Sequence, residues 1–201
     1  MARFVDQKGI PFLIEAFSRV AQYTDATLDL IGNGELFDSM KARVREFNLQ
    51  DRVVFHGWLA LTDAAEVIQQ CDVYLVPAIR DCGGCALLEA MAMGLPVIAA
   101  NWAGPGAYID DKSGIRVDVP SQEAFVQGLS EAMIKLAASA TLREQLGKGS
   151  LQRVRENYFD WDSKLDRIVE IFHEVLREAG RPAALASRQR SRRGVQQTFR
   201  S

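Results

Sequence analysis

The sequence predicts an α/β fold: a doubly wound, mainly parallel Rossmann-like sheet with a helical carboxyl end. Short runs of strand-forming residues alternate with amphipathic runs of helical spacing through most of the 201 residues. Strands separated by helices of this length indicate a parallel sheet covered on both faces. Glycine turns follow four of the strand runs, and open α/β sheets bind ligands beyond the carboxyl ends of their strands. We therefore expect the turns to converge on one crevice.

The strand runs are short, apolar and rich in β-branched residues, which favours buried strands. They lie at residues 27–31, 52–55, 73–76, 97–100 and 114–117. The helical runs place apolar side chains on one face, as Leu13, Phe17 and Val20 illustrate. A short helix is expected to begin at Thr62, whose hydroxyl suits an N-cap. The other helical runs lie at residues 12–20, 35–47, 85–93, 121–136, 141–157 and 161–179.

Composition indicates a globular protein, because 48% of the residues are hydrophobic and 25% are charged. No stretch approaches the roughly 20 apolar residues that span a bilayer, and the amino terminus lacks the pattern of a signal peptide. The cysteines, Cys71, Cys82 and Cys85, are an odd number without the spacing of a disulfide framework. We therefore expect a reducing, cytoplasmic location.

Length and charge divide the chain into one domain, residues 1–179, and a basic tail, residues 180–201. The tail carries six arginines and no acidic residue, so its removal changes the net charge from −2 to −8. Such an Arg/Ser/Gln-rich segment cannot bury enough apolar surface to fold alone, and we interpret it as a disordered, solvated end. Peripheral contact with anionic lipid at the inner face of a membrane is the alternative. Nucleic acid is a less favoured partner.

The most informative segment is the glycine turn after the strand run at residues 73–76. Gly83 and Gly84 allow backbone N–H groups to approach a ligand, and the helix that follows presents a partial positive charge suited to an anion. Asp81 precedes the turn and Glu89 lies about one and a half helical turns beyond it. Carboxylates are poor ligands for phosphate and good acceptors for sugar hydroxyls. The combination indicates a pocket for a nucleotide sugar.

The sequence motif L-L-E-A-M-A-x-G-x-P-V-I-A from Leu87 to Ala99 resembles the signature of family 4 (group 1) retaining glycosyltransferases of the GT-B fold. The resemblance implies a nucleotide diphosphate sugar as donor substrate, with no metal ion and no other cofactor. It assigns Glu89 to the ribose hydroxyls and Asp81 to a hydroxyl of the donor sugar. Asp81 stands where most family members carry a glutamate, so its carboxylate is one methylene shorter.

Residues 3–9, Arg-Phe-Val-Asp-Gln-Lys-Gly, resemble the turn by which the family binds the donor diphosphate. Arg3 supplies a planar fork of donors and Lys8 a compact charge, a pair suited to a pyrophosphate. Taken alone, an Arg and a Lys five positions apart are more often two surface residues without a shared function. The resemblance makes Arg3, Lys8, Asp81 and Glu89 the candidate catalytic residues.

Further residues at the expected crevice are candidates for substrate binding. Trp58 is expected either to flank the base or to be a buried core residue. The segment around Gly104 resembles a family loop, although Ala103 replaces its first glycine and Ala107 its usual glutamate. The complete set of substrate-binding candidates is Gly32, Gly34, Gly57, Trp58, Gly83, Gly84, Cys85 and Gly104.

Two other kinds of chemistry remain open. Cys82 and Cys85 begin a helix after a strand, as a thioredoxin-type redox pair would, but such a pair follows an early strand and these cysteines do not. A nucleotide-sugar epimerase would need an acid and a base near the sugar, and His56 is the one candidate histidine. We expect His56 instead to be a structural residue with a hydrogen-bond partner.

The resemblance covers residues 1–176 and corresponds to the second, donor-binding half of a GT-B enzyme. The family's acceptor-binding amino-terminal domain is not recognisable in the sequence, and we expect the first strand of the donor half to be truncated. A truncated central strand would leave backbone groups without partners. The predicted function is donor binding for retaining hexose transfer to an acceptor held by the other domain. The alternative is a donor-binding fragment without transfer activity, and we expect the isolated chain to be weak or inactive.

Overall fold

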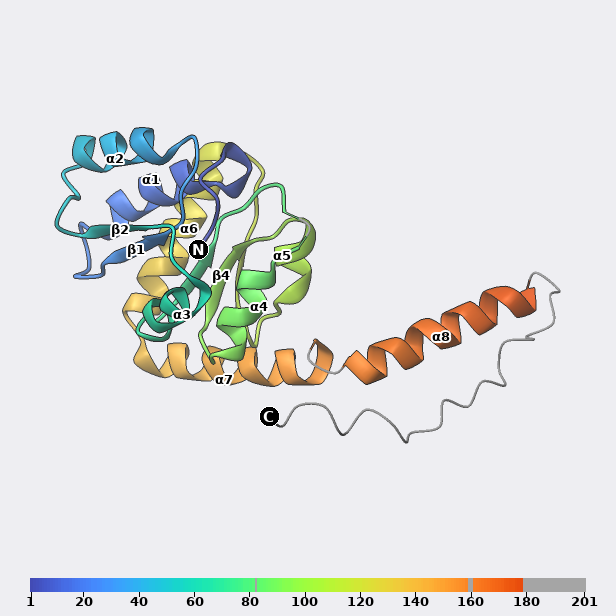
Figure 1. Ribbon diagram of the computed structural model, residues 1–201. Coiled ribbons are helices and arrows are strands. Elements are labelled where there is room, and N and C mark those ends of the chain that lie inside the picture. Colours follow the sequence, from blue (N-terminus) through green and yellow to red (C-terminus); the bar gives the residue numbers. More distant parts are fainter. Residues whose placement is uncertain (82, 159–160, 179–201) are drawn as a thin grey trace, which may run out of the picture. The chain divides into compact units, whose positions relative to one another are not determined.

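The computed structural model describes residues 1–81, 83–158 and 161–178 (Figure 1). Two compact units are present, residues 1–159 and 160–201, and each is described by itself. The elements of the first unit alternate along the chain as expected. They are η1 (Asp6–Lys8), α1 (Ile10–Val20), β1 (Leu28–Ile31), α2 (Phe37–Glu46), β2 (Val53–Gly57), α3 (Leu61–Gln69), β3 (Tyr74–Val76), α4 (Cys85–Ala92), β4 (Val97–Ala100), α5 (Ala103–Tyr108), β5 (Gly114–Val117), α6 (Gln122–Ala137) and α7 (Ala140–Asn157).

All the strand pairs are parallel, which confirms the predicted fold class. The strands form two sheets, however, where one was expected. β1 pairs with β2, and β3, β4 and β5 form a separate sheet in that order. β1 and β3 share no ladder among the described residues. We call β1–β2 the open sheet and β3–β4–β5 the closed sheet.

Two apolar clusters cover the sheets, and side-chain alternation along each strand sends neighbouring residues to different clusters. In β4, Ile98 packs into the first cluster and Val97 into the second. Helices α1, α2 and α6 contribute to the first cluster, whereas α3 and α4 contribute to the second. Helices therefore pack on both faces, as a doubly wound fold requires (Figure 1).

Serine side chains cap the starts of α6 and α7, whereas two expected local features differ in the structure. The Ser121 hydroxyl accepts a hydrogen bond from the Ala124 N–H and caps α6. The predicted Thr62 cap is wrong, since α3 begins at Leu61 and the Thr62 hydroxyl donates to the Asp63 side chain instead. Gly104 lies inside the short helix α5, where a turn was expected.

The second unit contains α8 (Trp161–Glu178), a strongly amphipathic helix. Six of its large apolar side chains are 42–62% exposed, and they belong to Leu165, Ile168, Val169, Ile171, Phe172 and Val175. The predicted basic tail lies outside the described residues. Across the part of the chain that the structure describes, no helix is both long enough and apolar enough to cross a bilayer.

Candidate functional site

The centre of the site is an ion pair between two segments 73 residues apart in sequence. Lys8 Nζ lies 2.6 Å from Asp81 Oδ2, and the two side chains are 25% and 17% exposed. Lys8 ends η1, and Asp81 follows β3. The pair therefore stands at the carboxyl end of a closed-sheet strand, where α/β folds bind ligands.

Close backbone packing fixes the position of Lys8. Gly9 has a left-handed φ of +68°, and a Cβ at this position would overlap the carbonyl oxygen of Pro77. The Gln7 carbonyl oxygen accepts hydrogen bonds from the N–H groups of Ile79 and Arg80. Only glycine allows this approach, and it brings the Lys8 side chain to the loop after β3.

The turn before α4 is organised around Asp81. The Gly83 N–H donates to Asp81 Oδ1 at 3.1 Å. Gly84 is the N-cap of α4 at a φ of +59°, and a Cβ there would lie 2.8 Å from the Tyr108 ring. Cys85 follows as the exposed first residue of the helix. The positive end of the α4 dipole thus lies beside Lys8 and Asp81.

Asp81 is held as a carboxylate. Burial alone would raise the pKa of its carboxyl, but the hydrogen bond from Lys8, the Gly83 N–H and the charge on Lys8 lower that pKa below its usual value. Of the four candidate catalytic residues, Lys8 and Asp81 are thereby brought into direct contact.

Arg3 and Glu89 are placed differently. Both are exposed, and neither side chain forms an ion pair or hydrogen bond within residues 1–81, 83–158 and 161–178. Glu89 lies near enough to Tyr74 for its charge to contribute to the raised pKa of that phenol, after the larger effect of burial. Arg3 and Glu89 are therefore free to meet a ligand, and their predicted roles stay predictions.

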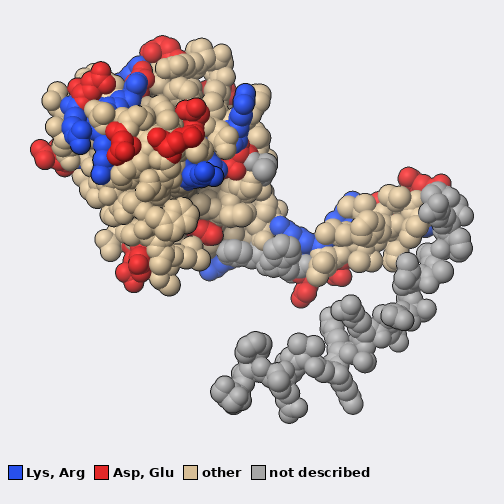
Figure 2. All heavy atoms as spheres, turned by 45° about the horizontal axis from the view of Figure 1, so that its top comes forward, with Lys and Arg blue, Asp and Glu red and all other residues tan. Residues whose placement is uncertain are grey.

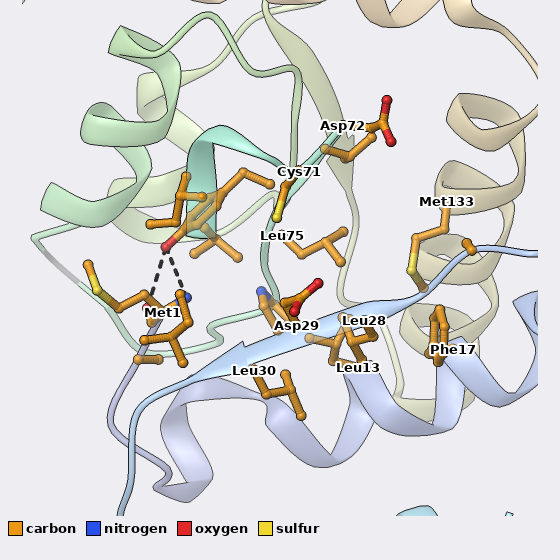
Figure 3. Close-up of a pocket in the computed structure, with 18 of the residues that line it drawn as sticks. Met1, Leu13, Phe17, Leu28, Asp29, Leu30, Cys71, Asp72, Leu75 and Met133 are labelled. Carbon is orange, nitrogen blue, oxygen red and sulfur yellow. Dashed lines mark hydrogen bonds between the residues drawn. The ribbon is translucent and has the colours of Figure 1, made fainter. Parts of the chain in front are cut away.

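A cavity of about 1000 Å³ extends from this site between β1 and β3 (Figure 3). Lys8, Asp81, Gly83, Gly84 and Cys85 line one part of it. The remaining predicted residues do not line it; they are Arg3, Gly32, Gly34, Gly57, Trp58, Glu89 and Gly104. The predicted set thus divides into a group that lines the cavity and a group that does not.

Gly32 and Gly34 make close contacts within the chain itself. A Cβ on Gly32 would overlap the carbonyl oxygen of Ala2, and one on Gly34 would overlap that of Phe4. The Gly32 N–H already donates to the Gly57 carbonyl oxygen. These two glycines therefore have a packing role that the sequence pattern did not reveal.

The end of β2 is open. Gly57 has a φ of +68° with no atom within 4 Å of a Cβ built on it. Trp58 is 77% exposed, so the alternative of a buried core tryptophan is wrong. An exposed indole beside an unobstructed glycine leaves room for a flat ligand group.

The loop after β4 reaches the same turn. The Gly104 N–H donates to the Asp81 carbonyl oxygen at 3.2 Å. Trp102, 58% exposed at the N-cap of α5, was not among the predicted residues. The signal that could have identified Trp102 is its position, two residues after β4 at the edge of the sheet where α/β folds bind ligands.

The structure bears on one of the two alternative chemistries. His56 Nε2 lies 2.7 Å from Asp29 Oδ1, which agrees with the expected structural histidine. Cys82 lies outside the described residues, and Cys85 is a free thiol.

Among residues 1–81, 83–158 and 161–178, no group of His, Cys, Asp or Glu is placed to hold a metal ion. Acidic and basic side chains are interspersed on the face of the first unit seen in Figure 2.

Comparison with known proteins gives a consistent family. The model of the family "Glycosyl transferases group 1" matches residues 1–153. The lipopolysaccharide core biosynthesis glycosyltransferase LpsE of Rhizobium meliloti is 30% identical over 149 residues, which are 74% of this chain and 41% of LpsE. The chain thus spans about two-fifths of the length of that relative.

Solved structures share the fold. A structure of S. aureus TarM with fondaparinux, alpha-GlcNAc-glycerol and UDP has a TM-score of 0.76 at 22% identity, covering 85% of this chain and 34% of TarM. The carboxyl-terminal domain of the group 1 glycosyl transferase LpcC from Francisella tularensis has a TM-score of 0.69 at 23% identity. That match covers 79% of this chain and 83% of the domain.

Proposed function

The chain belongs to the group 1 glycosyl transferases, and from this premise we propose that its first unit binds the nucleotide diphosphate sugar donor. The transfer itself, to an acceptor held by a further domain and with retained anomeric configuration, is part of the proposal. A fold like that of the LpcC carboxyl-terminal domain supports the assignment to the donor half. The UDP in the TarM structure supports the class of ligand.

One observation carries the proposal: Lys8, Asp81 and the start of α4 meet at the carboxyl end of β3. Lys8 and the exposed Arg3 would neutralise the diphosphate, while N–H groups at Gly83, Gly84 and Cys85 would donate to its oxygens. Positive charge there would stabilise the nucleotide as a leaving group when the glycosidic bond breaks. Glu89 would accept from ribose hydroxyls.

Asp81 has two roles in this scheme. Its Oδ2 atom accepts from Lys8 and its Oδ1 atom from Gly83, so a diphosphate must compete with Asp81 for the same donors. Once Lys8 turns to the diphosphate, the carboxylate is free to accept from a sugar hydroxyl. Removing the charge of Asp81 should therefore favour the bare nucleotide and disfavour the sugar.

Titration calorimetry with UDP, GDP and ADP and their hexose conjugates, with and without EDTA, tests the proposal. Lys8→Met should weaken binding of the preferred nucleotide about thirtyfold, since hydrogen bonds to charged groups contribute about 2 kcal/mol. Lys148→Met, on the exposed face of α7, is the matched control. Two results would contradict the donor site: no binding of any of the three nucleotides, or an equal loss of binding in the two lysine variants.

Two further variants test the roles of the carboxylates. Asp81→Asn should bind the nucleotide diphosphate at least as tightly as the unaltered chain, but lose its preference for the sugar conjugate. Glu89→Gln should weaken both by about tenfold, the loss of one charged acceptor. Glu66→Gln, an exposed carboxylate on α3, is the control.

We propose that transfer by the chain alone is weak, because catalysis by positioning needs donor and acceptor in one closed cleft. The assay is transfer to an acceptor panel, by the chain alone and mixed with an acceptor-binding half. Robust transfer by the chain alone would place the acceptor site within these residues.

An epimerase is less favoured, since its one candidate, His56, is engaged by Asp29.

A further inference from the structure

The loop between β4 and α5 carries an exposed tryptophan beside the Asp81 turn. Trp102 is 58% exposed and stands at the N-cap of α5. Two residues later, the Gly104 N–H donates to the Asp81 carbonyl oxygen at 3.2 Å. Because an extended chain spans about 3.5 Å per residue, the Trp102 Cα lies within about 10 Å of that oxygen. The indole is therefore a neighbour of the turn that precedes α4.

Backbone contacts hold this loop in place on both sides of the tryptophan. The Asn101 N–H donates to the Val117 carbonyl oxygen at 2.7 Å, and the Asn101 side chain donates to Asp118 at 2.6 Å. The Trp102 carbonyl oxygen accepts from the Gly106 N–H at 3.3 Å. A Cβ on Gly106 would lie 3.0 Å from the Asn101 carbonyl carbon, so α5 packs closely against the residue after β4. The backbone beneath the indole is thus fixed, while the side chain meets solvent.

The other end of α5 contacts the same turn. A Cβ on Gly84 would lie 2.8 Å from the Tyr108 ring, so the end of α5 packs on the N-cap of α4. Arg153 of α7 donates to the Tyr108 carbonyl oxygen and holds this end in place. Ala103, next to the tryptophan, has a left-handed φ of 48°, a conformation that costs free energy and is common at ligand sites. Trp102 therefore belongs to a rigid arrangement built around the turn before α4.

The groups gathered at this turn suit a sugar ring. An indole presents a flat apolar face whose π electrons attract polarised C–H bonds. A pyranose carries C–H bonds on its faces and hydroxyl groups around its edge. Lys8 and the Gly83 N–H hold Asp81 as a carboxylate, which accepts hydrogen bonds from hydroxyls. A ring stacked on Trp102 can therefore direct its edge to Asp81.

We propose that Trp102 binds a sugar by stacking its indole on a face of the pyranose ring, with hydroxyls of the same ring directed to Asp81. For a donor hexose this role rests on the proposed function, in which Asp81 accepts from the sugar. An acceptor sugar presents the same C–H face to the indole. In both cases Trp102 determines the preference for the sugar and does not contribute to binding of the bare nucleotide.

Calorimetry with UDP, GDP and ADP and with their glucose conjugates tests the donor sugar. Trp102→Leu removes the aromatic face and keeps an apolar side chain, and it should bind the conjugate about fivefold more weakly with the bare nucleotide unchanged. Trp102→Phe keeps an aromatic ring and should retain most of the preference for the conjugate. Trp58→Leu, the control at the end of β2, should change the affinity for both ligands by the same factor. Thermal unfolding checks that each variant folds.

Fluorescence with free sugars tests the acceptor and does not depend on nucleotide binding. The sequence has three tryptophans, so Trp58→Phe combined with Trp161→Phe leaves Trp102 as the one indole of the chain. Methyl glucoside, methyl galactoside and methyl mannoside are added with and without UDP. A sugar that stacks on the indole removes water from it and should shift its emission to shorter wavelength. Glycerol, which has hydroxyls but no ring face, should leave the emission unchanged.

The two experiments separate the sources of the sugar. Loss of the preference for the conjugate in Trp102→Leu assigns the indole to the donor sugar, and an emission shift with free glycosides assigns it to an acceptor sugar. Absence of both effects would overturn the proposal. So would an equal loss of nucleotide and conjugate in Trp102→Leu, a result that would assign the indole to the nucleotide. An emission shift in a chain that binds no nucleotide would contradict the donor function and still support the role of Trp102.

Discussion

The closed and open sheets are built from similar strands and differ in what surrounds them. β4 has a partner on each side, and all four of its residues, Val97 to Ala100, are fully buried. β1 has a partner on one side and a cavity of about 1000 Å³ on the other, although Leu28 and Leu30 are each only 5% exposed. The covering helices thus bury Leu28 and Leu30 although β1 has a described strand on one side only. The candidate donor site stands at the end of the closed sheet.

The largest expected contrast is between truncations in the two sheets. Ile98→Ala should lower the free energy of unfolding by about 4 kcal/mol, because β4 is enclosed on all sides. Leu30→Ala should cost about 2 kcal/mol, since Leu30 borders an existing cavity and loses fewer contacts. Urea unfolding of both variants measures the difference. Equal losses would mean that the open sheet is as tightly packed as the closed one.

Two glycines with the same backbone angle give the next contrast. Gly9 and Gly57 both have a φ of +68°, but a Cβ at Gly9 would overlap Pro77 and one at Gly57 would meet open space. Gly57→Ala should cost about 1 kcal/mol of left-handed strain. Gly9→Ala should cost about 3 kcal/mol, because displacement of the backbone adds to that strain.

Calorimetric titration of the same two variants extends the comparison to the site. Gly9→Ala should also weaken nucleotide binding, since the turn positions Lys8, whereas Gly57→Ala should do so only if the open space receives the base. Matched stability losses in the two variants would contradict the crowding at Pro77.

The Lys8–Asp81 pair predicts a response to acid at the end of the closed sheet. The pKa of Asp81 is lower in the folded chain than its usual value, so its stabilising contribution is complete above about pH 4 and is lost as the pH falls through the folded pKa. The contribution should be about 1 kcal/mol or less for a partly exposed pair. Unfolding of Asp81→Asn from pH 7 to pH 2 should show a shallower pH dependence than that of the unaltered chain. Parallel curves would be the contrary result.

The smallest expected effect concerns two non-glycine residues of left-handed conformation. Ala103, after β4, has a φ of 48°, and Asn48, before β2, has a φ of 55°. Ala103→Gly should raise the melting temperature slightly, by relieving about 0.5 kcal/mol of strain. Asn48→Gly should change stability by about half as much or less, because asparagine tolerates this conformation. Destabilisation of Ala103→Gly would show that the methyl group is needed for packing.

Local patterns predicted most of the elements, and the errors have local causes. The strand at residues 97–100 and the helix beginning after Gly84 were predicted from apolar runs bounded by glycine and proline. The cap at Thr62 was wrong because the helix begins one residue earlier and leaves the hydroxyl to Asp63. Asp81 was a candidate from its place before the glycine turn and Lys8 from a family resemblance, and their contact could not come from spacing alone.

The sequence by itself determined the order of strands and helices, the parallel fold class and the family, because these depend on short-range periodicity and on motifs within about fifteen residues. The tertiary structure decided what joins residues far apart. It paired Lys8 with Asp81 and packed Gly32 against Ala2. Contacts of this kind depend on how whole elements pack around a core, and side-chain alternation carries no information about which elements lie side by side.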